Sequence, residues 1–146
     1  MVIPRSRLAF FYGLLAFVAL LATWNQNLHY FGGGAAASGG LGAFVKDTFA
    51  NPAASSITLD LGILVLAVAI WMVLEARRLG MPYVWLYIVG AFLTAISVTF
   101  PLFMLMRERR LATLGQVQPA ITGADAIGLA LVAVPTLVLS VWSLFA

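Results

Sequence analysis

Four long apolar segments constrain this chain more than any other feature of its sequence. They cover residues 8–25, 54–76, 83–106 and 125–145. Each is close to the roughly 20 helical residues that cross the hydrocarbon core of a bilayer, which is about 30 Å thick. Because a backbone in lipid must satisfy its own hydrogen bonds, such segments cross membranes as helices. The sequence therefore predicts an all-α integral membrane protein, a four-helix bundle formed as one domain over residues 1–146.

The composition supports this fold class and excludes several kinds of site. Of the 146 residues, 63% are hydrophobic and 9% are charged, whereas soluble domains carry about 25% charged residues. The sequence has no cysteine, which excludes disulfides and thiolate chemistry. Its single histidine, His29, argues against a metal site, because such sites draw on several His or Cys ligands. We expect no metal, no cofactor and, with a small and scattered net charge of +3, no nucleic-acid partner.

Local signals mark the second span most clearly. Asn51 and Pro52 form a helix start, with asparagine as the N-cap and proline at the first helical position. Gly80 stands where a left-handed residue commonly ends a helix. The next helix is predicted to start at Pro82 after a short turn, so the second and third spans should form an antiparallel hairpin. Pro101 should kink or loosen the last turns of the third span.

The connection between the first and second spans carries an amphipathic segment over residues 41–50. Apolar residues fall near one helical face and charged residues on another: Leu41, Phe44, Val45 and Phe49 against Lys46 and Asp47. This pattern predicts a short interfacial helix on the membrane surface, with a partly ordered loop as the alternative. We interpret the first span as a retained helix and not as a signal peptide, because no small-residue cleavage site follows it.

The basic residues leave the membrane orientation undetermined. If side A is the side that holds the N-terminus, the four spans place four basic residues on each side. Side A receives Arg5, Arg7, Arg77 and Arg78, and side B receives Lys46, Arg107, Arg109 and Arg110. The positive-inside rule is therefore tied, although the long glycine-rich loop argues mildly that side B lies outside. A tie also leaves dual topology open.

Polar residues gather at the side B ends of the predicted spans. Asp60 lies about two turns inside the second span, where a charged residue costs roughly 2.5–3.5 kcal/mol on insertion scales. The predicted site consists of Asn25, His29, Asp60, Asp125 and Arg107. These residues would line a polar mouth that opens into an apolar bundle and binds a lipophilic ligand. Asp60 is the candidate catalytic residue, as a proton donor or acceptor.

Each of these residues also has an explanation that needs no ligand. Asp60 could bond neighbouring hydroxyl groups or Asn25 and hold helices together. Asp125 could cap the fourth helix. His29 would then be an interfacial residue, and Arg107 an anchor in the lipid headgroups.

Several short motifs together resemble one uncharacterised family. They are Asn51-Pro52 followed by Asp60, then Glu75-Ala76-Arg77-Arg78-Leu79-Gly80-Met81, Trp85-Leu86-Tyr87, Pro101-Leu102-Phe103 and Arg107-Glu108-Arg109. As a set they resemble small bacterial membrane proteins catalogued as domain of unknown function 2834, over about residues 8–110. The resemblance implies a multi-pass protein of the bacterial inner membrane and brings no established activity.

Three classes of function remain open. The one we favour is a lipid- or lipophile-binding protein or an accessory subunit of a membrane assembly, whose partners are membrane lipids, a second copy or a larger complex. The second is an isomerase- or cyclase-type enzyme that acts on an isoprenoid-like substrate, with Asp60 as proton donor. The third is a small dual-topology transporter, although the first span lacks the acidic residue usual in four-helix exporters. A cavity that reaches Asp60 would favour the enzyme.

Overall fold

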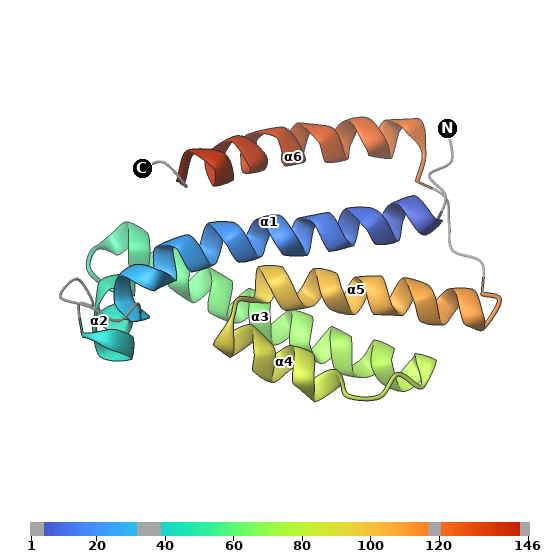
Figure 1. Ribbon diagram of the computed structural model, residues 1–146, viewed down its shortest axis with the longest axis horizontal. Helices are drawn as coiled ribbons and strands as arrows, with labels where there is room; N and C mark the ends of the chain where they lie inside the picture. Colours follow the sequence, from blue (N-terminus) through green and yellow to red (C-terminus); the bar gives the residue numbers. More distant parts are fainter. Residues whose placement is uncertain (1–4, 32–38, 117–120, 144–146) are drawn as a thin grey trace.

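The computed structural model describes residues 5–31, 39–116 and 121–143 (Figure 1). Six helices lie within these ranges: α1 (Arg5–Phe31), α2 (Gly40–Thr48), α3 (Pro52–Leu79), α4 (Val84–Leu93), α5 (Ile96–Thr113) and α6 (Gly123–Ser143). The described ranges contain no strand. The predicted all-α class is therefore confirmed.

Three of the helices are long and apolar enough to cross a membrane, over Arg7–Phe31, Pro52–Leu79 and Gly123–Trp142. They correspond to the first, second and fourth predicted spans. No more than 6% of the most apolar stretch of each is buried within the chain. Long helices whose apolar side chains face outward are typical of a membrane protein, because lipid covers those faces.

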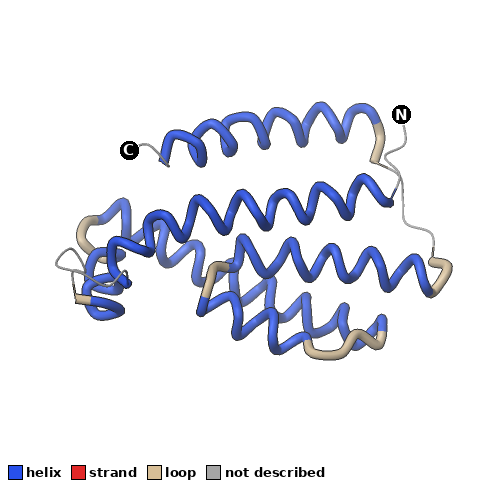
Figure 2. Tube along the Cα trace, viewed as in Figure 1, coloured by secondary structure: helices blue, strands red, loops and turns tan. Residues whose placement is uncertain are grey.

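The third predicted span is not a single helix. The helical backbone stops after Leu93, and Ala95 is extended, with φ −176° and ψ 150°. The chain then turns back on itself, so that α4 and α5 run in opposite directions (Figure 2). Pro101 consequently lies in the second turn of a new helix, and not near the end of an old one. The four-helix bundle is replaced, in the described residues, by three long helices and a short helical hairpin.

Close contacts between α4 and α5, the two arms of the hairpin, confirm it. A Cβ atom at Gly90 would lie 3.3 Å from the Thr99 Cγ2 atom, and the Tyr87 and Phe103 rings are 5.7 Å apart. Thr94 ends α4 by donating from both its backbone N–H and its hydroxyl to the Gly90 carbonyl, each at 2.8 Å. The turn thus satisfies part of its own backbone without a Gly or Pro at the break.

Helix α5 lies at the centre of the fold, beside α1, α3 and α4 (Figure 1). It runs parallel to α3. The Trp71 ring of α3 lies about 6 Å from both the Phe100 and Phe103 rings of α5, and further along both helices Glu75 accepts a hydrogen bond from Arg107. The buried core between α3, α4 and α5 consists of Met72, Ala76, Val84, Ile88 and Phe103. Helix α6 contacts α1 alone among the described helices.

The cap signals of α3 are confirmed in detail. The Ala54 N–H donates to the Asn51 Oδ1 atom at 2.9 Å, and Pro52 is the first helical residue. Gly80 follows the helix in the left-handed conformation, with φ +61°. These short-range signals therefore fix both ends of the longest helix.

A short helix, α2, occupies the predicted amphipathic segment. The Tyr30 hydroxyl at the end of α1 donates to the Asp47 carboxylate at 2.9 Å, and the Tyr30 and Phe44 rings pack edge to face. Leu41, Val45 and Phe49 remain exposed. The helix is thus tied to α1, and its place on a membrane surface remains a prediction.

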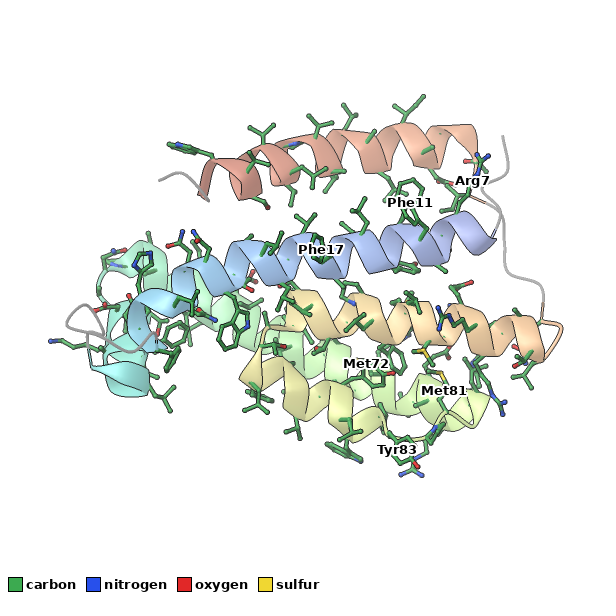
Figure 3. The ribbon with its side chains drawn as sticks, in the orientation of Figure 1. Arg7, Phe11, Phe17, Met72, Met81 and Tyr83 are labelled. Carbon is green, nitrogen blue, oxygen red and sulfur yellow. The ribbon has the colours of Figure 1, made fainter. Side chains whose placement is uncertain are left out.

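The hairpin changes where the basic residues lie. The start of α1, the α3–α4 turn and the end of α5 share one end of the molecule (Figure 1), which we call the arginine end; the opposite end, which holds α2, is the α2 end. Figure 3 shows Arg7, Met81 and Tyr83 toward the arginine end. The prediction that Arg107, Arg109 and Arg110 lie opposite Arg77 and Arg78 is wrong, because the chain reverses at Thr94 and Ala95.

Candidate functional site

The structure divides the five predicted site residues between the two ends of the molecule. Asn25, His29 and Asp60 lie toward the α2 end, on the last turns of α1 and the early turns of α3, and all three are exposed. Arg107 and Asp125 lie toward the arginine end, on the last turns of α5 and the first turn of α6. The predicted polar mouth is therefore not assembled from these five residues.

Asp60 is neither tightly packed nor placed in a cavity. It is exposed on α3 between Leu59 and Leu61, which are also exposed. It lines neither the groove between α4 and α5 nor the groove between α1 and α6. Neither of these two grooves therefore brings this carboxyl group to a substrate.

Asp125 has a structural role at the start of α6. Its Oδ2 atom accepts hydrogen bonds from the Thr122 N–H at 2.9 Å and from the Thr122 hydroxyl at 2.7 Å. The Asp125 N–H in turn donates to the Thr122 hydroxyl at 3.3 Å. This reciprocal pattern is a capping box, with Thr122 as the cap and Asp125 three residues on. The Thr-x-x-Asp spacing was the sequence signal for it.

Arg107 is the centre of a buried cluster of ion pairs. Its Nε atom donates to Glu75 Oε1 at 2.7 Å, and its Nη1 atom donates to Glu108 Oε1 at 2.9 Å. Glu75 also accepts two hydrogen bonds from Arg78, at 2.6 and 2.7 Å. The side chains of Glu75 and Glu108 are only 9% and 3% exposed. The Arg78 side chain is 51% exposed, so it is the two pairs made by Arg107 that tie α3 to α5 below the molecular surface.

The surroundings of the cluster favour a fixed arginine. The Arg107 guanidinium lies 5.8 Å from the centre of the Trp71 ring, within range of a cation–π contact. The Glu108 Oε2 atom is buried and has no hydrogen-bond partner in the described chain.

The sequence alone predicts only part of this cluster. From the sequence, Glu75 and Arg78 are only an interfacial pair three residues apart. The spacing could not show that Arg107, 32 positions away, completes the cluster.

A groove of about 630 Å³ lies between α4 and α5 at the arginine end. Its walls are mainly apolar or aromatic: Met81, Pro82, Tyr83, Leu86, Tyr87, Thr99, Leu102 and Met106. Its remaining lining residues lie on the last turns of α5: Arg109, Arg110 and Thr113. Sequence reasoning missed this groove, because its walls meet only when the chain reverses after α4.

Residues 11–109 of the chain match the model of a protein family described as protein of unknown function DUF2834. The chain belongs to this family. The DUF2834 match covers 99 of the 146 residues, reaching from the second turn of α1 almost to the end of α5. It agrees with the resemblance over residues 8–110 and leaves α6 outside. No curated protein and no solved structure matches the chain significantly.

The DUF2834 segment contains the whole Arg107 cluster and all but two of the residues that line the groove. Those two, Arg110 and Thr113, follow directly. The Arg110 Nε atom donates to the Leu79 carbonyl at the end of α3, at 2.9 Å. Arg109 and Arg110 are both exposed. The groove therefore ends in two accessible guanidinium groups, one of which is held in place.

The groove also contains an unusual backbone conformation. Tyr83, just before α4, has φ 62° and is the only non-glycine residue with a positive φ in the described part of the chain. The left-handed conformation costs a non-glycine residue roughly 1–2 kcal/mol. Local strain of this kind gathers at functional sites. Its occurrence here adds to the reasons for regarding the groove as the candidate site.

A second groove, of about 520 Å³, lies between α1 and α6. It is lined by Ala22, Thr23, Gln26, Asn27, Thr136, Leu139 and Ser140. None of the five predicted site residues is among them. The hydroxyl and amide side chains among these residues fit contact between two helices, so we regard this groove as part of the α1–α6 packing.

Proposed function

We propose that this chain is a multi-pass membrane protein that binds a lipophilic molecule in the groove between α4 and α5. The observation that carries the proposal is the groove itself, which lies at one end of three long apolar helices. It has apolar walls and ends in Arg109 and Arg110, which we call the arginine rim. Ligand sites are typically concave and mostly apolar, with a few polar groups that fix orientation. A lipophile would lie with its apolar part along α4 and its polar part toward the arginine end.

Helix lengths support a re-entrant hairpin. Helix α4 has 10 residues, which reach about 15 Å at 1.5 Å per residue. This is about half of a 30 Å hydrocarbon core, whereas the 28 residues of α3 are more than enough to cross it. We therefore propose that α1, α3 and α6 cross the membrane. Helices α4 and α5 would enter from the arginine end and turn near the midplane.

Such a turn is acceptable at that depth only if protein covers it or water reaches it. Thr94 and Ala95 are partly buried in the described chain, and Thr94 bonds to the Gly90 carbonyl with both of its donors. These contacts reduce the number of backbone groups that would meet lipid unpaired. They support a hairpin tip inside the bilayer.

The hairpin also breaks the tie in basic residues. Seven of the eight lysine and arginine residues now belong to the arginine end, and only Lys46 belongs to the α2 end. Because cytoplasmic loops are rich in Lys and Arg, we propose that the arginine end is cytoplasmic, in the inner membrane of a bacterium. This asymmetry removes the support for a dual-topology transporter.

Lipid retention tests the proposal. Leu86 and Leu102 line the groove and are 70% and 39% exposed. A Leu86→Ala/Leu102→Ala double variant should lose contact surface with a lipophile, so native mass spectrometry should show several-fold less co-purified lipid than in the wild type. The matched control is Leu61→Ala/Leu64→Ala, on the outward face of α3, where both leucines are about half exposed. Equal retention by both double variants would overturn the groove as the site.

A role as an accessory subunit is the second candidate. Helix α6 has no buried residue in its most apolar stretch and touches only α1 among the described helices. Its outer face is free for another membrane protein as well as for lipid. Extraction in native membrane discs would show this role as a particle containing a second kind of chain, and α6 variants such as Leu131→Ser would release that chain.

The enzyme has less support than either of these. Its candidate proton donor, Asp60, is exposed and lies outside both grooves. A proton donor must come within hydrogen-bond reach of the substrate. The geometry therefore supports binding in preference to catalysis at Asp60.

A further inference from the structure

We infer that the groove between α4 and α5 holds an anionic phospholipid of the surrounding leaflet, with its phosphate on Arg109 and Arg110. The inference rests on the proposed function and adds the chemical class of the lipophile. It follows from the charges, the position and the shape of the arginine rim.

The charges at the arginine end do not balance within the groove. Glu75 pairs with Arg78 and Arg107, and Glu108 pairs with Arg107 through its Oε1 atom, while its Oε2 atom is buried without a hydrogen-bond partner in the described chain. The third carboxylate at this end, Asp125, accepts hydrogen bonds from Thr122 at the start of α6. Arg109 forms no ion pair in the described chain, and Arg110 donates only to a backbone carbonyl. The rim therefore presents two guanidinium groups to an anion, and basic pockets at the cytoplasmic side of membrane helices bind anionic headgroups.

The geometry of Arg110 suits a phosphate. Its Nε atom is fixed on the Leu79 carbonyl at 2.9 Å, which leaves the Nη groups as donors. A planar guanidinium donates two parallel hydrogen bonds to phosphate, and these charge-assisted bonds are stronger than neutral ones. Because Arg110 is held by α3, little freedom would be lost when it binds a headgroup.

The depth of the arginine rim in the membrane also fits binding to a lipid phosphate. Arg109 lies 13 residues beyond Ile96, or about 20 Å along the helix from the turn. If the turn lies near the midplane, the rim lies just outside the hydrocarbon half-thickness of about 15 Å, at the level of lipid phosphates. Leu102 and Met106 are then at the depth of the acyl chains. Apolar walls next to an anion site select a lipid over a soluble phosphate.

Native mass spectrometry of the detergent-purified full chain, titrated with phosphatidylglycerol and separately with phosphatidylcholine, tests the inference. We expect tighter binding of phosphatidylglycerol to the wild type. Arg109→Gln should weaken that binding by about tenfold, as befits the loss of a charge-assisted hydrogen bond, and should leave phosphatidylcholine binding unchanged. Arg77→Gln is the matched control, since Arg77 is exposed at the same end and does not line the groove.

The outcomes separate the inference from the proposed function. Equal binding of both lipids by the wild type and by Arg109→Gln would overturn the anionic headgroup while keeping the lipophile site. Binding of neither lipid would overturn both. An equal loss in Arg109→Gln and Arg77→Gln would show diffuse surface attraction and overturn the defined site. Full displacement of phosphatidylglycerol by inorganic phosphate would overturn the lipid in favour of a soluble anion.

Discussion

Arg107 shows at the scale of one residue how this fold holds charge inside an apolar chain. It meets a carboxylate from α3 and another from its own helix, and the Trp71 ring covers it. A buried charge that has partners is tolerated, whereas one left alone is very costly. We conclude that the cluster fixes α3 against α5, and thereby positions the arginine rim that follows it.

Removing one carboxylate should therefore destabilise the protein. Glu75→Gln takes the shared partner from Arg107 and Arg78, and we expect a loss of about 3–5 kcal/mol in the free energy of unfolding, the usual cost of breaking a buried pair. Denaturant unfolding in detergent micelles measures the loss. Arg77→Gln, which removes an exposed charge of the same helix, should stay close to the wild type. Coincident unfolding curves for Glu75→Gln and the wild type would contradict the structural role.

Single residues also show which structural roles could be predicted from the sequence and which could not. Asn51 and Gly80 were predicted as the caps of α3 and are found as such, because capping depends on residues only a few positions apart. The partners of Glu75 and Glu108 could not be assigned, since pairing across helices depends on the fold. Asp60 is predicted as a site residue because it is a charge in an apolar run, and its exposure shows that such a run alone does not define a site.

At the scale of elements, the α4–α5 hairpin is the feature that hydropathy could not predict. Residues 83–106 are continuously apolar enough to be taken for one helix, and the break falls at Thr94 and Ala95 with no Gly or Pro to mark it. The hairpin brings α4 and α5 into close contact, where Gly90 lies against Thr99. This contact is a tertiary property, and sequence periodicity does not show it.

A larger side chain at Gly90 should force α4 and α5 apart. A Cβ atom at Gly90 would lie 3.3 Å from Thr99 Cγ2, so Gly90→Val places still more atoms there. We expect a loss of about 1–3 kcal/mol in unfolding free energy, which is typical of overpacking. Gly62→Val on α3 is the control, because nothing lies within 4 Å of a Cβ there. If thermal unfolding in micelles shows the same midpoint for both variants, the close packing of the hairpin is contradicted.

For the whole molecule, the consequence of the hairpin is an unequal distribution of charge. Four spans would divide the basic residues evenly, whereas the observed path gathers seven of the eight at one end. The same path builds the groove from the start of α4 and the end of α5. The all-helical fold and three long apolar helices followed from composition and run length, but topology and site depended on where one run turns.

The most direct test of this topology is the accessibility of single cysteines, which the natural chain lacks. Pro82→Cys lies in the α3–α4 turn and Gln116→Cys follows α5, both at exposed positions, with Lys46→Cys on α2 as the reference for the other face. A membrane-impermeant maleimide applied to inside-out vesicles should label Pro82→Cys and Gln116→Cys and spare Lys46→Cys, and right-side-out vesicles should give the reverse. Labelling of Pro82→Cys and Gln116→Cys from opposite faces would show that residues 83–106 cross the membrane, which would contradict the re-entrant hairpin.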